Sequence, residues 1–143
     1  MNPKTTQHSI TVSIVIPCFN HGQYIQEALD SIDHQKINYN IQVIIVDDGS
    51  DDGTSEFIHS NYPNLKYIFQ SNSGVSAARN TGIKAASSNW IAFLDSDDAW
   101  VTNKIQKQIT ELELNPDFSA ASLIFKSSLK INSNAFLILT ISR

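Results

Sequence analysis

Residues 41–50 read IQVIIVDDGS, and this stretch decides the fold. Its first six residues are apolar apart from Gln42, a composition typical of a strand that is buried on both faces. The run stops abruptly at Asp47 and Asp48, which begin an acidic turn. Residues 10–17, ITVSIVIP, have the same character and stop at a proline. Strands buried on both faces are those of a parallel sheet covered by helices.

Helices are predicted between the strands, and Ser73 is expected to cap the third of them. The elements expected along the chain are a strand at 10–17, a helix at 23–34, a strand at 41–46, a helix at 54–60, a strand at 65–69, a helix at 73–86, a strand at 90–94 and a helix at 101–114. Such alternation requires right-handed crossovers. It predicts an α/β fold with a Rossmann-like, mostly parallel sheet and helices on both faces, to which residues 119–143 add one or two strands.

The chain has 143 residues, which fits one domain over 1–143. Ten basic against 14 acidic residues give a net charge of −4, with 41% hydrophobic and 17% charged residues. This is the composition of a globular protein, and the negative charge makes it a poor partner for nucleic acid. A single cysteine excludes an internal disulfide, and no apolar stretch approaches the roughly 20 residues of a membrane span.

Seven of the 14 acidic residues sit in two loops, each directly after a predicted strand. They are Asp47, Asp48, Asp51 and Asp52 in the first loop and Asp95, Asp97 and Asp98 in the second. The carboxyl ends of parallel strands meet at one edge of a sheet, so we expect the two loops to lie close together and to share one divalent cation, Mg²⁺ or Mn²⁺. Such an ion also bridges phosphates. The alternative is that each loop is only turn and helix-capping chemistry.

Other ligand-binding motifs do not fit. Residues 48–59 match an EF-hand loop at several positions, but the last position is His59 instead of a glutamate, and a strand precedes the loop. Neither a P-loop nor a G-x-G-x-x-G dinucleotide motif occurs. A signalling receiver needs an aspartate after the third strand, where Phe69, Gln70 and Ser71 stand instead.

Four segments together resemble the amino-terminal half of the family 2 glycosyltransferases, which have the GT-A fold. They are VSIVIPCFNHGQYIQEALDSI at 12–32, IQVIIVDDGSDDGT at 41–54, NSGVSAARNTGIKAA at 72–86 and WIAFLDSDDAW at 90–100. Their order and spacing make the resemblance specific, and it covers residues 12–117.

The resemblance implies a role for each matching residue. Pro17 and Phe19 match the turn that lies against the nucleotide base, and Asp48 matches the acid that accepts a hydrogen bond from the base. Asp95 and Asp97 match the ends of the D-x-D motif: the first contacts the ribose or a metal-bound water, and the last binds the metal. Arg79 matches a residue that helps to fix the nucleotide.

The implied function is metal-dependent, inverting transfer of a sugar from a nucleotide-diphosphate donor to an acceptor hydroxyl in glycan or polysaccharide biosynthesis. The implied partners are the donor and a glycan or lipid-linked acceptor. The expected location is the cytoplasm, including the inner face of the membrane, and a homodimer is compatible with the chain.

The sequence departs from the family in one respect. Inverting transfer needs a general base, and the acids after Asp98 are Glu111, Glu113 and Asp117, on or just after the last predicted helix. The expectation is therefore a truncated chain with the donor site and without the acceptor half. A non-catalytic fragment that binds the nucleotide sugar is the alternative reading.

The remaining chemically active side chains are interpreted as structural. Cys18 lacks a histidine and asparagine partnership, so it is expected to be a small packed residue rather than a nucleophile. The four histidines are dispersed without metal-ligand spacing and are expected on the surface; they are His8, His21, His34 and His59.

Overall fold

The computed structural model describes residues 11–35, 37, 39–88, 90–115, 120–122 and 137–140. The strands are β1 (Thr11–Cys18), β2 (Asn40–Asp47), β3 (Lys66–Phe69), β4 (Trp90–Phe93), β5 (Ala120–Ser122) and β6 (Leu137–Thr140). The helices are α1 (Ile25–Asp33), α2 (Thr54–Asn61), α3 (Val75–Ala85) and α4 (Lys104–Leu114). The eight elements from β1 to α4 follow the predicted order.

The described strands form one sheet in the order β3-β2-β1-β4-β6-β5. The first four in this order are parallel, whereas β6 runs antiparallel to both β4 and β5. The predicted α/β fold with a mostly parallel sheet is therefore confirmed. Because β1 lies between β2 and β4, the two acidic loops leave the sheet on either side of it.

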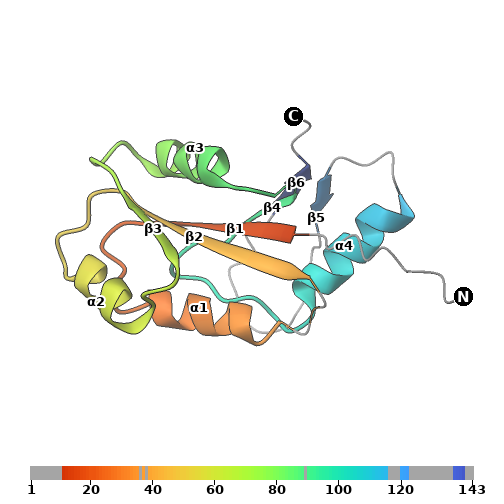
Figure 1. Cartoon of the computed structure of the whole chain (residues 1–143), viewed down its shortest axis with the longest axis horizontal. Coiled ribbons are helices and arrows are strands. Elements are labelled where there is room, and N and C mark those ends of the chain that lie inside the picture. Colours follow the sequence, from red (N-terminus) through yellow and green to blue (C-terminus); the bar gives the residue numbers. More distant parts are fainter. Residues whose placement is uncertain are drawn as a thin grey trace, which may run out of the picture.

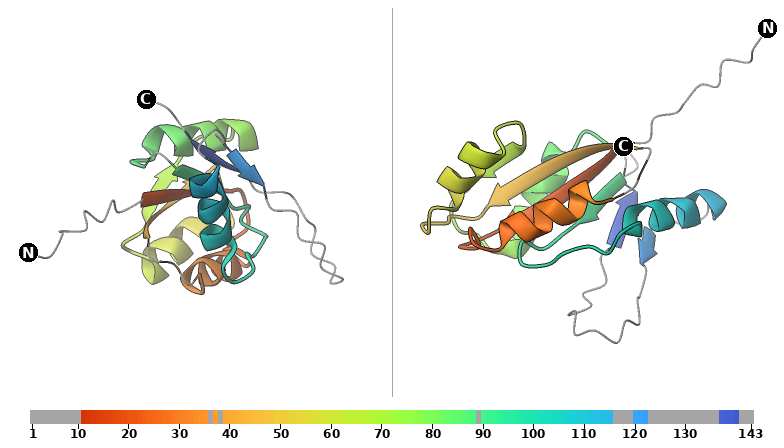
Figure 2. Two further views of the ribbon diagram at one scale, coloured as in Figure 1. Left: turned by 90° about the vertical axis from the view of Figure 1, so that its right-hand side faces the viewer. Right: turned by 90° about the horizontal axis from the view of Figure 1, so that it is seen from below.

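Helices cover both faces of the sheet (Figure 1), as predicted. On one face α1, α2 and α4 pack against the larger core, in which Ile14, Ile25 and Ile109 are fully buried. On the other face α3 packs against a smaller core through Ala78. α4 lies beside the short strands β5 and β6 at one end of the sheet (Figure 2).

Gly82 allows α3 to lie very close to β1. A Cβ atom at this position would lie 2.2 Å from Cγ1 of Val15, which is far inside van der Waals contact. The absence of a side chain on Gly82 therefore sets the depth at which α3 sits on the sheet. This matters for function because the amino-terminal half of α3 carries Arg79.

Two predicted helix starts are corrected by the structure. The N-cap of α3 is Gly74 and not Ser73, whose backbone N–H instead donates to the Asp48 carboxylate. α4 begins at Lys104 instead of residue 101, because Asn103 takes a left-handed conformation with φ 67°. None of the described helices combines the length and the apolar character that a bilayer span requires.

Candidate functional site

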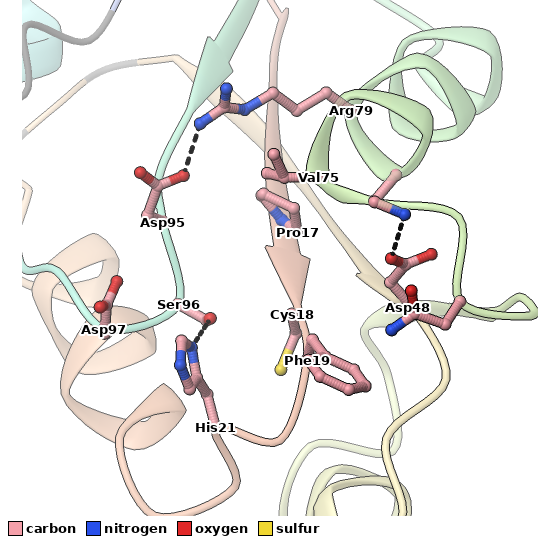
Figure 3. Close-up of a pocket in the computed structure, with 13 residues that line it drawn as sticks. Pro17, Cys18, Phe19, His21, Asp48, Val75, Arg79, Asp95, Ser96 and Asp97 are labelled. Carbon is pink, nitrogen blue, oxygen red and sulfur yellow. Dashed lines mark hydrogen bonds and ion pairs between the residues drawn. The ribbon is translucent and has the colours of Figure 1, made fainter.

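A cavity of about 560 Å³ opens at the carboxyl ends of β1, β2 and β4, next to the start of α3 (Figure 3). This is the edge of an open α/β sheet at which ligands usually bind. The residues to which the family resemblance gives a role all line this cavity; they are Pro17, Phe19, Asp48, Arg79, Asp95 and Asp97. The residues that complete the lining are Cys18, His21, Asn72, Gly74, Val75, Ala78 and Ser96.

Asp48 forms one side of the cavity, and its carboxylate is held by three donors. Oδ1 accepts hydrogen bonds from the Gln70 amide at 2.6 Å and from the Ser73 backbone N–H at 2.9 Å, and Oδ2 accepts one from the Gly74 N–H at 2.7 Å. Burial alone would raise the pKa of Asp48, but these hydrogen bonds outweigh burial and lower the pKa. The side chain is therefore ionised and fixed in position at neutral pH.

The turn around Asp48 is itself tightly determined. Asp47 is fully buried and accepts hydrogen bonds from the Tyr67 hydroxyl and from the Ser50 backbone N–H. Gly49 has φ 90°, and a Cβ atom there would lie 3.0 Å from the backbone nitrogen of Asn72. The sequence D-D-G-S thus places one acid inside the fold and turns the next toward the cavity.

Arg79 and Asp95 face one another across the other side of the cavity. The Arg79 guanidinium reaches from α3 and donates to Oδ1 of Asp95 at 2.8 Å, with both side chains partly exposed. The guanidinium carbon also lies 5.9 Å from the centre of the Phe93 ring. Within the described part of the chain, Nε of Arg79 is buried and has no hydrogen-bond partner.

Asp97 is the exposed acid of this side. Its neighbour Asp98 is partly buried, and burial together with the charges of Asp97 and Asp95 raises the pKa of Asp98. The three carboxyl groups of this loop therefore repel one another, and the Arg79 guanidinium balances only part of their charge. A cation bound at Asp97 would relieve this repulsion.

The prediction that both acidic loops share one cation stays a prediction, and the strand order argues against a cation shared by Asp48 and Asp97. The loops follow β2 and β4, which are two strand spacings apart, or about 10 Å. Two oxygens that bind the same Mg²⁺ lie within about 5 Å of each other, and the donors of Asp48 hold its carboxylate on the far side of β1 (Figure 3). In the described ranges, no three acidic, histidine or cysteine side chains gather closely enough to hold a metal.

A metal held by Asp97 alone still fits the chemistry of this loop. Mg²⁺ is commonly bound by one or two carboxylates together with waters and the phosphates of a substrate. Asp97 is exposed and lines the cavity, and Asp95 lies two positions earlier in the loop. The residues therefore suit a metal that arrives with a diphosphate rather than one held by a complete protein cage.

Sequence reasoning missed several contributors to the cavity. His21 was expected on the surface, yet it lines the cavity and its Nδ1 lies 2.7 Å from Oγ of Ser96. Gln70, which holds Asp48, is in turn held by the Thr81 hydroxyl of α3. His21 and Gln70 both lie in loops at the carboxyl edge of the sheet, and this position is the signal that could have identified them. Cys18 is buried, as predicted.

Comparison with known proteins agrees with the fold. An uncharacterized glycosyltransferase of Rickettsia felis is 40% identical over 114 residues, which is 78% of this chain and 19% of that protein. The minor teichoic acid biosynthesis protein GgaA of Bacillus subtilis is 42% identical over 102 residues, 66% of this chain and 23% of that protein. The chain thus spans about a fifth of the length of these relatives.

A solved structure gives the same picture. The crystal structure of S. aureus TarS residues 1–349 in complex with UDP-GlcNAc superimposes with a TM-score of 0.66 at 28% identity, covering 78% of this chain and 33% of that one. The fold is therefore the GT-A fold. The model of the family described as glycosyl transferase family 2 matches residues 13–136, nearly the whole chain. With the sheet order, the cavity and this match in agreement, the chain belongs to glycosyl transferase family 2.

Proposed function

We propose that the cavity binds a nucleotide-diphosphate sugar and forms the donor site of a sugar transfer to an acceptor hydroxyl. The observation that carries this proposal is the arrangement of charge around β1. A buried carboxylate at Asp48 that accepts three hydrogen bonds from the protein lies on one side, and an exposed carboxylate at Asp97 lies on the other. A nucleoside diphosphate has the matching asymmetry, with a neutral base at one end and a charged diphosphate at the other.

Asp48 would read the base. An ionised carboxylate has about four acceptor positions, and three of these are filled by protein donors. The remaining position suits one N–H group, such as the imide of uracil. Phe19 and Val75 line the same cavity and are about half exposed, so they offer apolar contact to the faces of a base. Pro17 forms the floor between them.

Asp97 would hold the metal, and Asp95 and Arg79 would contact the ribose and phosphates. When bound, Mg²⁺ or Mn²⁺ supplies a positive charge that stabilises the departing diphosphate. Arg79 would keep Asp95 oriented and offer its Nε to the nucleotide. The carboxylates of this loop repel one another, and a bound cation would offset this repulsion.

The wider context follows from the relatives. TarS is described with UDP-GlcNAc, and GgaA with minor teichoic acid biosynthesis. By analogy, the proposed transfer is inverting, belongs to glycan or polysaccharide biosynthesis and uses a glycan or lipid-linked acceptor. The proposed location is the cytoplasm or the inner face of the membrane, and a homodimer stays a prediction.

A second candidate is a module that binds the donor without transferring the sugar. It is favoured by the roles of the acids in the described part of the chain: Asp48, Asp95 and Asp97 line the cavity, and each already has a binding role. Glu111 and Glu113 lie on α4 and do not line the cavity. In the described part of the chain, no carboxylate besides Asp48, Asp95 and Asp97 lines the cavity, where a general base would have to lie.

Titration calorimetry tests the proposal directly. UDP, dTDP and GDP are titrated into the chain with Mn²⁺, and again with a chelator. We expect binding of at least one nucleotide, strengthened by Mn²⁺. The absence of binding under every condition would reject the donor site. Adding the matching nucleotide sugars and assaying release of the free nucleotide then separates the enzyme from the module, because only the enzyme turns the donor over.

A further inference from the structure

One loop connects both sides of the proposed donor site. Residues 18–22 run from the end of β1 to α1, between the two acidic loops. Toward the Asp48 side, the Asn20 backbone N–H donates to Oγ of Ser50 at 2.9 Å, and the Asn20 side chain accepts from the Asp51 N–H at 2.9 Å. The Gly22 N–H also donates to Asp52. This half of the loop is therefore fastened to the first acidic turn.

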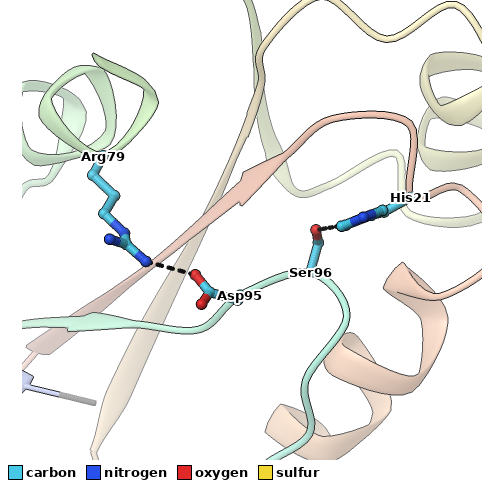
Figure 4. Close-up of polar contacts among 4 residues, drawn as sticks. All are labelled: His21, Arg79, Asp95 and Ser96. Carbon is cyan, nitrogen blue, oxygen red and sulfur yellow. Dashed lines mark hydrogen bonds and ion pairs between the residues drawn. The ribbon is translucent and has the colours of Figure 1, made fainter. Parts of the chain in front are cut away.

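Toward the other side, the loop is fastened by His21. Its Nδ1 lies 2.7 Å from Oγ of Ser96, the central residue of Asp95-Ser96-Asp97 (Figure 4). The two residues are 75 positions apart in the chain, so the contact is tertiary. Ser96 is only 2% exposed, whereas its neighbour Asp97 is exposed. The buried serine thus carries the contact, and the acid beside it is left for the ligand.

Cys18 completes a small polar cluster beneath this loop. Cys18, Ser96 and His21 all line the cavity (Figure 3). Burial is the main reason that the pKa of Cys18 is raised to about 11, so the thiol keeps its proton at neutral pH.

The His21 ring is also supported on its own side. Tyr24 lies edge-on to it, with ring centroids 5.9 Å apart and planes at 87°. On the far side of the D-x-D segment, Arg79 holds Asp95. His21 and Arg79 therefore contact neighbouring residues of one loop from two different segments (Figure 4). Asp97 is the next residue of this loop.

We propose that His21 is a positioning residue that, through its Nδ1 contact with Ser96, sets the place of Asp97 for the metal and diphosphate of the donor. The proposal rests on the proposed function, since it takes Asp97 as the metal-binding acid. It is specific to one half of the site, because Asp48 is held by Gln70, Ser73 and Gly74 without His21.

Three substitutions of His21 distinguish this role from simple packing. Asparagine places an amide atom where Nδ1 stands, glutamine places one where Nε2 stands, and alanine places none. Calorimetric affinity for UDP, or for whichever nucleoside diphosphate the wild-type chain binds, is measured with Mn²⁺ and with a chelator. We expect His21→Ala and His21→Gln to lower the Mn²⁺-dependent affinity about 10-fold or more, the effect typical of losing a partner behind a metal ligand.

The conservative variant and a matched control complete the set. His21→Asn is expected to stay within about threefold of the wild type, since it keeps a partner for Ser96. Affinity measured with the chelator should be nearly unchanged in all three variants. His34→Ala removes an exposed histidine at the end of α1 and should leave both affinities unchanged. Thermal unfolding of each variant reports whether it folds.

A double-mutant cycle with Ser96→Ala tests the pair itself. If His21 acts through Ser96, the double variant binds no worse than the weaker single variant. Equal affinity of His21→Ala and the wild type with Mn²⁺, an equal loss with the chelator, or failure of His21→Asn to restore binding would each overturn the proposal. If the wild-type chain binds no nucleoside diphosphate, the proposed function is overturned instead. The wild-type titration therefore tests the proposed function separately from the role of His21.

Discussion

Asp48 and Asp97 lie at the ends of two strands that flank β1, yet the two carboxylates differ in exposure and in their hydrogen bonds. Asp48 is 4% exposed and accepts three hydrogen bonds from the protein. Asp97 is exposed, and its neighbours are two further acids, one of which has a raised pKa because of burial and the nearby charges. On one side of the cavity the carboxylate is therefore held in place by the protein, whereas negative charge accumulates on the other side.

The two sides of the cavity therefore suit two kinds of recognition: the Asp48 side recognises shape, and the Asp97 side recognises charge. A carboxylate fixed by three donors cannot reorganise, so it can select a ligand by the position of a single N–H group. A loop of repelling carboxylates has little selectivity for shape, but it attracts a cation strongly. The distance of about 10 Å across β1 allows the Asp48 side and the Asp97 side to act independently of each other.

The largest expected effect concerns the charged side. Asp97→Ala should remove the Mn²⁺-dependent part of nucleotide binding, by roughly 100-fold or more, because even residues behind a metal ligand are worth about 10–100-fold. The fold should remain intact, since an exposed loop side chain is removed. Calorimetry with Mn²⁺ and with a chelator measures the effect.

A matched control for this variant is Asp51→Ala. Asp51 is an exposed acid of the other loop that does not line the cavity, so its removal changes the net charge equally. We expect its Mn²⁺-dependent affinity to match that of the wild type. If both variants lose the same affinity, the effect comes from overall charge, and Asp97 has no special role.

The next effect concerns the side that we assign to the base. Asp48→Ala should weaken nucleotide binding by about 1.5–3 kcal/mol, the value of a hydrogen bond to a charged group. The loss should be the same with Mn²⁺ and with a chelator, in contrast to Asp97→Ala. A loss confined to the Mn²⁺ titration would place Asp48 at the metal and remove the distinction between the two sides.

The fold could be predicted from the sequence because its signals are local. Each of the four parallel strands is a short, mainly apolar segment, and acids stand at the end of β2 and shortly after β4. The regular alternation with helical segments then leaves few topologies. The start of α3 was misplaced because its cap depends on a distant partner: the backbone of Ser73 is bonded to Asp48, 25 residues earlier.

The site was predicted less completely, for a geometric reason. The sequence shows which strands are followed by acids, but not that β1 lies between these two strands. The same limit hid His21, whose partner Ser96 is 75 residues away. The residues to which the resemblance gave a role all line the cavity, while the contacts of Gln70 with Asp48 and of His21 with Ser96 become visible only once the loops are side by side.

A third prediction tests whether α3 couples the two sides. The start of α3 donates to Asp48 through Gly74, and its first turns carry Arg79, which holds Asp95. Gly82→Ala would force a Cβ atom against Val15, so α3 should shift outward at a cost of about 1–3 kcal/mol in the free energy of unfolding. Chemical denaturation measures this loss.

The binding data for the same variant sharpen the comparison. Because α3 contacts both sides, Gly82→Ala should lower nucleotide affinity with Mn²⁺ and with a chelator. Ser76→Ala is a suitable control, since Ser76 is exposed on the same helix. A variant that is less stable but binds normally would show that the cavity does not depend on the depth of α3.

The smallest effect expected is in the acid stability of the chain. Hydrogen bonds outweigh burial and lower the pKa of Asp48 in the native state, so the unfolded chain binds more protons in this range and stability falls as pH falls. The loss begins near the ordinary pKa of 3.8 and is complete below the lowered native pKa. In Asp48→Asn the free energy of unfolding, measured by denaturant titration from pH 6 downward, should therefore fall less steeply.

Asp52, whose pKa is also lowered, still contributes to the dependence of the free energy of unfolding on pH in this variant. An unchanged slope would mean that the three donors of Asp48 do not favour its ionised form, and the contrast with Asp97 would then lie in exposure alone.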